Sequence, residues 1–194
     1  VHPIDDGPVF LLDTYKSPFD SIPLVLSELR QLQAPRKRLV LSNLHDYSGN
    51  PKSKFKKIYL EARDIVDEVV FVGDAAHHVK PSREDREEGR FHNFSDLEEA
   101  SRFLKATAVP GEIIFLKGSM AWHLERLWLD WRATVRCWPR VCNVKSEFCP
   151  SCGMYDRPYR EHHGKGKDPS RSKLGSAASV DDINVIKDLR TTQE

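Results

Sequence analysis

The sequence has no long hydrophobic run, whereas a membrane helix needs about 20 consecutive apolar residues. It also lacks the G-x-x-x-x-G-K-[ST] loop that cradles phosphates and the G-x-G-x-x-G fingerprint of dinucleotide-binding proteins. We therefore expect a chain that does not span a membrane and cannot hold ATP by itself. No signal peptide is recognisable, and Val1 stands where an initiator methionine is expected. We expect a cytoplasmic location, and a chain cut or processed from something longer.

Cysteine is scarce and confined to one stretch, because all four cysteines lie between Cys137 and Cys152. Disulfides that staple a fold are usually spread along the chain, so local metal binding is the better interpretation. The 194 residues, of which 39% are hydrophobic, suffice for one domain and a small appendage. The formal net charge of +1 neither favours nor excludes a nucleic-acid partner.

Five short apolar segments have the composition of buried strands, and amphipathic segments separate them. The predicted strands cover residues 9–13, 38–44, 68–72, 90–94 and 113–116. Strands that alternate with helices predict an α/β fold, with a mostly parallel sheet and helices on both faces. Ligands of such sheets bind beyond the carboxyl ends of the strands, and those ends carry Asp13, Asn43, Gly73 and Lys117.

Residues 111–131 predict a strand, a tight turn and a helix in succession. Lys117, Gly118 and Ser119 form the turn, and apolar residues from Met120 onward repeat at helical spacing. Gly118 would let the backbone approach a ligand or adopt a positive φ, and Ser119 would cap the helix. A lysine and a helix N-terminus at this edge suit an anionic ligand. The alternative is an ordinary turn with an exposed lysine.

The segment between the third and fifth strands carries charges and two adjacent histidines. His77 and His78 have no acidic or thiol residue nearby in sequence, so we do not expect a metal there. Residues 81–89 predict a charged loop. Ser95 and Glu98 predict a capping box that opens the next helix.

Four segments in register resemble the Mur ligase family, and most closely its MurF type, which joins D-alanyl-D-alanine to a UDP-muramoyl tripeptide. The segment D-T-Y-K-S-P-F-D-S, from Asp13 to Ser21, is similar to the D-[ST]-Y-N-A-N-P-[DE]-S segment that opens the C-terminal domain of that family. The other similar segments are V-L-S-N-L with Asp46, V-F-V-G ending at Gly73, and F-L-K-G-S followed by L-E-R.

The resemblance implies that residues 1–134 are a Rossmann-like domain of a three-domain, ATP-dependent amide ligase of peptidoglycan precursor synthesis. The partners it implies are an N-terminal and a central ligase domain and a small peptide or nucleotide-linked substrate. The central domain would form an acyl phosphate, which an amine then attacks. The domain seen here would close over the site, position the acceptor and exclude water.

The resemblance also implies roles for single residues. Asp13, Tyr15 and Lys16 would lie on the side of ATP and its Mg²⁺, and Lys117, Gly118 and Ser119 would hold an anionic part of the acceptor. For Lys16 the alternative is an exposed turn lysine, and for Asp13 it is a turn or helix cap.

The sequence also departs from the family pattern at several positions. Lys16 and Pro18 replace two asparagines, Ser42 and Asn43 replace a Gly-Asp pair, and Met120 replaces an arginine. These departures leave an alternative function open: a domain without catalytic activity that binds a partner through its cysteine appendage.

The cysteines form a C-x4-C, x6, C-x2-C array made by Cys137, Cys142, Cys149 and Cys152, and Gly153 follows in the turn. Four thiolates suit tetrahedral, structural Zn²⁺. Disulfides and unpaired thiols are the alternatives, and His162 or His163 could replace one cysteine. We expect a zinc-knuckle-like appendage over residues 135–160.

Residues 161–194 predict a flexible basic tail with a short helix over residues 181–189. Together with the zinc knuckle, this tail could contact nucleic acid. Few aromatic residues are interleaved with the basic ones, so this prediction is weakly supported.

Overall fold

The computed structural model of the protein describes residues 1–144 and 147–162, and the predicted tail helix lies outside them. Its strands are β1 (His2–Pro3), β2 (Val9–Asp13), β3 (Lys37–Leu41), β4 (Glu68–Val72), β5 (Phe91–Phe94) and β6 (Ile113–Lys117). Its α-helices are α1 (Ile22–Gln31), α2 (Pro51–Ala62), α3 (Arg83–Glu87), α4 (Leu97–Ala106), α5 (Glu125–Leu129) and α6 (Cys149–Cys152). Short 3-10 helices are η1 (Phe19–Ser21), η2 (Gly73–His77) and η3 (Tyr159–Glu161). Within the described ranges, no helix has the length and apolarity to cross a bilayer.

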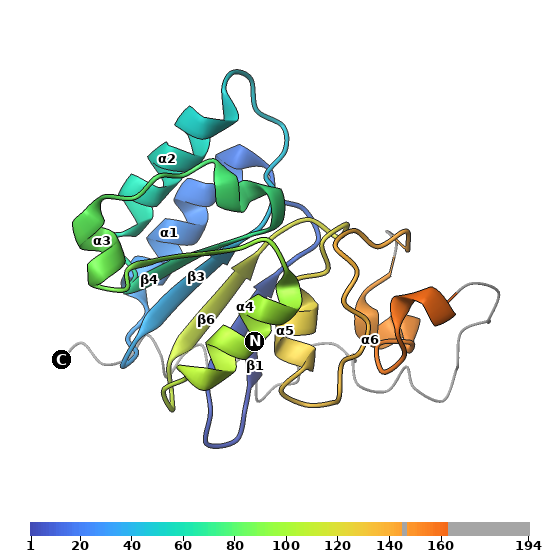
Figure 1. The fold of residues 1–194 in the computed structure, drawn as a ribbon. Helices are drawn as coiled ribbons and strands as arrows, with labels where there is room; N and C mark the ends of the chain where they lie inside the picture. Colours follow the sequence, from blue (N-terminus) through green and yellow to red (C-terminus); the bar gives the residue numbers. More distant parts are fainter. Residues whose placement is uncertain (145–146, 163–194) are drawn as a thin grey trace.

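One six-stranded sheet runs through the molecule in the order β1-β2-β6-β3-β4-β5 (Figure 1). The five strands from β2 to β6 pair in parallel, and only the two-residue β1 is antiparallel to its neighbour. The predicted α/β fold with a mostly parallel sheet is therefore confirmed. All five predicted strands exist, with boundaries that differ by at most a few residues.

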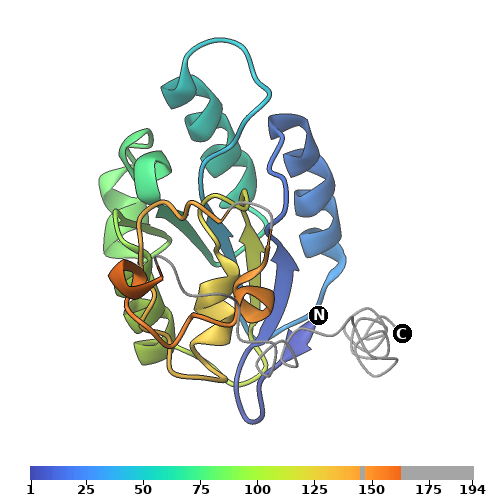
Figure 2. The ribbon, with the colours of Figure 1, turned by 90° about the vertical axis from the view of Figure 1, so that its right-hand side faces the viewer.

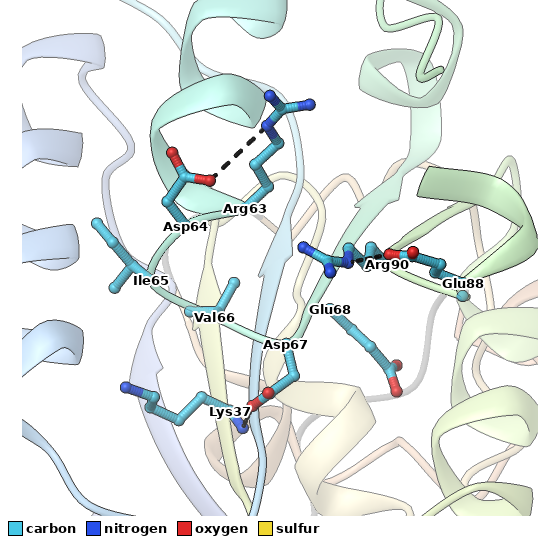
Figure 3. Close-up of a pocket in the computed structure, with 10 residues that line it drawn as sticks. Lys37, Arg63, Asp64, Ile65, Val66, Asp67, Glu68, Glu88 and Arg90 are labelled. Carbon is cyan, nitrogen blue, oxygen red and sulfur yellow. Dashed lines mark hydrogen bonds and ion pairs between the residues drawn. The ribbon is translucent and has the colours of Figure 1, made fainter. Parts of the chain in front are cut away.

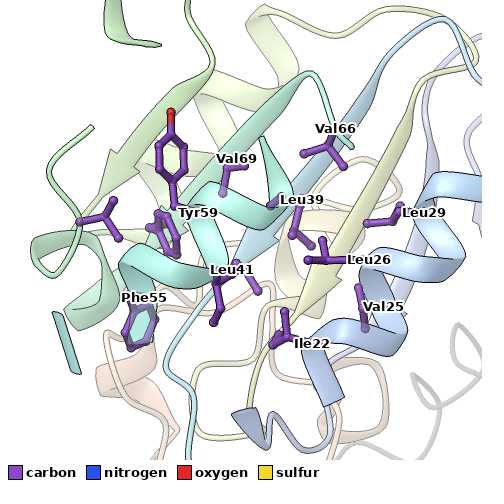
Figure 4. Close-up of a cluster of buried hydrophobic side chains, with 14 of the residues drawn as sticks. Ile22, Val25, Leu26, Leu29, Leu39, Leu41, Phe55, Tyr59, Val66 and Val69 are labelled. Atoms are coloured by element: carbon purple, nitrogen blue, oxygen red, sulfur yellow. The ribbon is translucent and has the colours of Figure 1, made fainter. Parts of the chain in front are cut away.

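Alternate residues of the central strands enter two separate cores. Leu39 and Leu41 pack with α1 and α2 on one face, as Figure 4 shows, whereas Val40 packs with α4 and α5 on the other. All three side chains are fully buried. Each such aliphatic side chain stabilises the fold by about 1.5–3 kcal/mol through burial. Helices thus cover both faces, as predicted.

The predicted helix that begins at Ser119 is wrong. Turns occupy residues 120–122, His123 has a positive φ of 48°, and α5 spans only Glu125–Leu129. A side chain with a positive φ cannot continue a right-handed helix. The residue before α5 is Leu124, so Ser119 caps nothing. The apolar residues still reach the core, Leu124 from the turn and Leu127 and Trp128 from α5.

Two smaller predictions between β4 and β6 are also wrong. The N-cap of α4 is Asp96, whose carboxylate accepts hydrogen bonds from the backbone N–H groups of Glu98 and Glu99 at 2.7 and 3.3 Å. The predicted capping box from Ser95 therefore does not form. Residues 81–89, predicted as a loop, contain α3, which Ser82 caps through its side chain.

The cysteine segment lies against α5 (Figures 1 and 2) and does not stand apart from the domain. Cys149 and Tyr155 belong to the same hydrophobic cluster as Leu127 and Trp128 of α5. The boundary at residue 134 stays a prediction, but the two parts share a core. The predicted appendage is therefore packed onto the domain.

Candidate functional site

Asp13 and Lys117 face each other at the carboxyl edge of the sheet. They are the last residues of β2 and β6 and are direct partners in the parallel pairing. The chain after β2 leads to α1 on one face, and the chain after β6 leads to α5 on the other. Adjacent strands whose connections diverge in this way leave a crevice where α/β proteins bind ligands. The two predicted site segments therefore share one edge, as the resemblance implied.

The ammonium group of Lys117 is held by the protein itself. Its Nζ donates to Asp13 Oδ2 at 2.7 Å and to the carbonyl oxygen of Lys16 at 2.7 Å. The side chain of Lys117 is 2% exposed, whereas that of Asp13 is 42% exposed. Lys117 therefore shapes the loop after β2, and Asp13 is the member of the pair that can also reach a ligand.

Gly118 is required because neighbouring side chains pack closely against it, and not because its φ is positive. A Cβ at this position would lie 2.7 Å from Leu124 Cδ1 and closer still to Ser42 Oγ. Its φ is not among the positive values of the chain. The positive φ expected for Gly118 is therefore wrong, whereas its contact with a ligand stays a prediction; the glycine permits close approach between the end of β3 and the turn after β6.

Three predicted site residues remain accessible at the same edge. Tyr15 is 57% exposed, Lys16 is exposed and Ser119 is partly exposed. The Met120 N–H donates to the Tyr15 carbonyl oxygen at 3.3 Å, so the two loops run side by side. The loop after β2 is further fixed by His45, whose Nε2 accepts from the Ser17 N–H at 2.9 Å. Nothing in the sequence had indicated His45.

Trp122 closes another part of this edge. Its ring lies over Gly73, where φ is +76° and where any Cβ would collide with the indole. Trp122 is buried, with 3% exposure. The glycine after β4 is therefore required both by its backbone conformation and by the tryptophan above it.

The four cysteines converge on one small enclosed cavity of ≈ 10 Å³, which His123 and His162 also line. None of the four forms a disulfide, and Cys137, Cys142 and Cys149 are buried. A cavity of this volume has room for about one water molecule or one ion.

The C-x2-C half of the array has the predicted turn. Cys149–Cys152 form α6, and Gly153 follows in the left-handed region with φ 69°. The Gly153 N–H donates to the Cys149 carbonyl oxygen at 3.1 Å, which closes the turn. Two thiols two residues apart can then reach the same ion.

His123 lines the cavity and Glu125 contacts two residues of its wall, and sequence reasoning missed both. Glu125 Oε1 lies 2.7 Å from His123 Nδ1 and accepts from the Cys149 N–H at 3.1 Å. The other ring nitrogen of His123, Nε2, lies 2.8 Å from the Val144 carbonyl oxygen. Ligand atoms of His123, Glu125 and Cys149 all lie within 4.8 Å of one another. His77 and His78 lie elsewhere, in or next to η2.

The contacts of His123 favour its cationic form. Burial alone would lower its pKa, but hydrogen bonds with Cys142, Cys149 and Glu125 raise the pKa of His123 to about 12. Both ring nitrogens face acceptors, so both must carry hydrogen. A cation beside four sulfur atoms offsets the negative charge that thiolates would bring.

Burial affects the thiols unequally. It raises the pKa of Cys137 to about 12 and also raises the pKa of Cys149. Burial acts on Cys142 in the same sense, but hydrogen bonds with His123 and the Val144 backbone outweigh it and lower the pKa of Cys142. Thiols with raised pKa values must lose their protons before they can bind a metal.

A comparison with protein families identifies the family to which this domain belongs. The profile of the family described as Mur ligase, glutamate ligase domain, matches residues 2–120. The chain belongs to this family. The match covers every strand of the sheet, both members of the Asp13–Lys117 pair and the turn up to Met120. It ends before Cys137, so the cysteine array lies beyond the part of this Mur ligase domain that the profile matches.

Solved structures of Mur ligases share the fold. The MurF ligase from Thermotoga maritima in complex with ADP has a TM-score of 0.53 and 18% identity, covering 66% of this chain and 30% of that chain. A crystal structure of MurF from Acinetobacter baumannii has a TM-score of 0.51 and 22% identity, covering 64% and 28%. The present chain thus spans under a third of the ligases that it resembles. No match to a curated protein was found.

A groove of this Mur ligase domain lies at the opposite, amino edge of the sheet (Figure 3). It has a volume of ≈ 740 Å³ and lies between the starts of β3 and β4 and the residues after α3. Its cations have partners inside the protein: Arg63 with Asp85 at 3.4 Å, Arg90 with Glu88 at 2.6 Å, and Lys37 Nζ with the Leu29 carbonyl oxygen at 3.1 Å. Charges of both signs that neutralise one another give this groove no preference for an anion.

Proposed function

We propose that this chain is the acceptor-positioning C-terminal domain of a Mur-type, ATP-dependent amide ligase that makes a peptidoglycan precursor in the cytoplasm. The observation that carries the proposal is the Asp13–Lys117 pair at the crevice of a sheet with this ancestry. The phosphate-binding loop is missing from the sequence, so a central domain must hold the phosphates of ATP.

The chemistry assigned to this domain is positioning. Asp13, with Tyr15 and Lys16 exposed beside it, offers a carboxylate, an aromatic ring and a cation to the nucleotide side. Ser119 offers a hydroxyl to the acceptor. The Lys117 ammonium holds the loop that carries these groups, because it donates to the Lys16 carbonyl oxygen. We therefore propose that Lys117 is a positioning residue and not a substrate contact. ATP with Mg²⁺ would supply the activating phosphoryl group when bound to the complete enzyme.

The test uses the protein encoded by the whole reading frame that contains this chain. ADP release is measured with and without amine acceptors such as D-alanyl-D-alanine. We expect acceptor-dependent release, a KM for ATP raised at least tenfold by Asp13→Ala, and no change with the matched surface variant Asp64→Ala. Release that no acceptor stimulates, or an Asp13→Ala variant that behaves like Asp64→Ala, would contradict the proposal.

A second candidate function is a binding module that has lost ligase activity. The replaced asparagines at Lys16 and Pro18 favour it, as do Val141 and Phe148 of the cysteine segment, whose exposures of 47% and 40% suit a protein partner. This alternative predicts no nucleotide binding by the complete protein. It also predicts that Cys149→Ser abolishes capture of a partner.

We further propose that Cys137, Cys142, Cys149 and Cys152 bind one structural Zn²⁺ ion as thiolates. Four sulfur atoms around a cavity for one ion are what a closed tetrahedral site requires. His123 and Glu125 are the competing ligands. We assign them the support of the thiolates, because Glu125 accepts from the Cys149 N–H at 3.1 Å and lies 2.7 Å from His123.

Native mass spectrometry tests this site. We expect one zinc per chain, which a chelator removes. Cys149→Ser should contain no zinc, whereas the matched control Ser151→Ala should keep the ion. Full zinc content in Cys149→Ser would reject the four-thiolate set in favour of another group of ligands.

A further inference from the structure

The turn over residues 119–124 carries the acceptor side of the proposed site but has little structure of its own. Its internal backbone bond joins the Trp122 N–H to the Ser119 carbonyl oxygen at 3.0 Å. His123 holds a positive φ, which costs free energy unless its surroundings impose it. The helix that follows has only five residues, too short to be stable alone. Support must come from elsewhere in the fold.

The cysteine segment supplies that support. The Cys142 N–H donates to the Ala121 carbonyl oxygen at 3.2 Å, and the ring of His123 reaches the Val144 carbonyl oxygen at 2.8 Å. The buried Arg126 lies between the two segments. It donates to the Trp122 carbonyl oxygen at 3.0 Å and, from its other terminal nitrogen, to the Cys137 carbonyl oxygen at 2.9 Å.

The other side of the same turn contacts the edge that holds the proposed site. Gly118 N–H donates to the Asp13 carbonyl oxygen at 3.1 Å, and Met120 N–H donates to Tyr15. Arg140 of the cysteine segment pairs with Asp74 of η2 at 2.5 Å. A continuous set of contacts therefore runs from the thiol cavity to the proposed ligand-binding edge.

The cysteine segment itself has no helix or strand between α5 and α6 in the part that the structure describes. A segment of this kind takes its order from a bound metal when it has one. We infer that metal binding by the four cysteines fixes the turn over residues 119–124, so that an ion outside the proposed site determines the geometry of that site. Arg126 is the positioning residue that connects the two. This inference rests on the proposed metal site, and it relies on the proposed ligase function only where it calls the edge ligand-binding.

Hydrogen exchange on the complete chain, without any substrate, tests the inference. It compares zinc-loaded, chelator-treated and zinc-reloaded protein. We expect amides of residues 119–124 and 137–144 to exchange at least tenfold faster after chelation, to recover on reloading, and those of β3 and β4 to stay unchanged. Unchanged exchange over residues 119–124, or an equal increase in β3 and β4, would overturn the inference.

Cys149→Ser and its control Ser151→Ala distinguish the loss of the metal from other effects of the chelator. Cys149→Ser should reproduce the fast exchange without chelator, whereas Ser151→Ala should not.

Arg126→Met should retain one zinc by native mass spectrometry and still exchange faster over residues 119–124. The matched control Arg132→Met, at an exposed arginine, should match the unmodified chain. Equal protection of this turn in Arg126→Met and Arg132→Met would contradict the positioning role. Because no ligase activity is measured, failure here is distinct from failure of the proposed function.

Discussion

Lys117 and Asp13 are 104 positions apart in the sequence, yet the Lys117 ammonium lies 2.7 Å from the Asp13 carboxylate. This contact ties the ends of β2 and β6 together at the edge where their connections diverge. One partner is buried and the other is half exposed, so the pair combines a structural role with a surface that a ligand can reach.

Removing the carboxylate of Asp13 should destabilise the domain, because the buried Lys117 ammonium then loses a charged acceptor. We expect Asp13→Ala to lower the free energy of unfolding by about 1–3 kcal/mol, the cost of leaving a buried polar group unsatisfied. Urea unfolding measures this loss. Lys56→Met, on the solvated face of α2, is the control and should change stability by less than about 0.5 kcal/mol. Equal effects of the two variants would refute the structural role of the pair.

A methyl group at position 118 should fit only if the side chains of Ser42 and Leu124 move. Gly118→Ala is expected to cost about 1–3 kcal/mol, the usual range for overpacking. Adding Ser42→Gly removes one of the two colliding side chains, so the double variant should recover part of that loss. Strictly additive effects in the double-mutant cycle would show that Ser42 and Gly118 are not in contact.

Metal affinity should depend on pH in one direction. The raised pKa values of Cys137 and Cys149 mean that both thiols are protonated at neutral pH without metal, and that metal binding releases both protons. Affinity should therefore fall as pH falls, by about a hundredfold per pH unit if two protons are released. Competition with a chromophoric chelator, corrected for the chelator's own protonation, measures this slope. An affinity that does not vary between about pH 8 and about pH 6 would contradict thiolate ligation.

Substitutions at the amino edge of the sheet should lower the free energy of unfolding without changing the turn over residues 119–124. Arg38 and Glu112 are fully buried there, with Arg38 Nε 3.3 Å from Glu112 Oε2 and Arg36 also paired with this carboxylate. Glu112→Gln removes one of the two carboxylates that pair with the buried guanidinium of Arg38, the other being Glu68 at 3.2 Å, and should cost about 1–3 kcal/mol. Exchange rates over residues 119–124 should not change, because this turn lies at the other edge. The exposed control Glu84→Gln should leave urea unfolding unaltered, and a similar loss in both variants would disprove the buried role.

The strands were predictable from the sequence because continuous apolar runs such as residues 68–72 suit a sheet buried on both faces. The turn after β6 was not, because the apolar residues after Ser119 repeat as a helix would require. Tertiary contacts with Ser42, Gly73 and the cysteine segment override that pattern.

The cysteines of the proposed metal site were recognisable from their spacing, but His123 and Glu125 beside them were not. These two residues acquire their role from Val144 and Cys149, which are 21 and 24 positions away and come close only in the fold. In the same way, the pairing of Lys117 with Asp13 was not predictable, because the two residues are 104 positions apart in the sequence.

The most direct test of the central claim is a crystal structure of the complete protein with ADP and Mg²⁺. The account predicts that the Asp13 carboxylate lies within about 4 Å of the nucleotide or its ordered waters, with Ser119 facing the same cleft. A nucleotide bound in the complete protein while Asp13 and Ser119 face solvent on another side would contradict it.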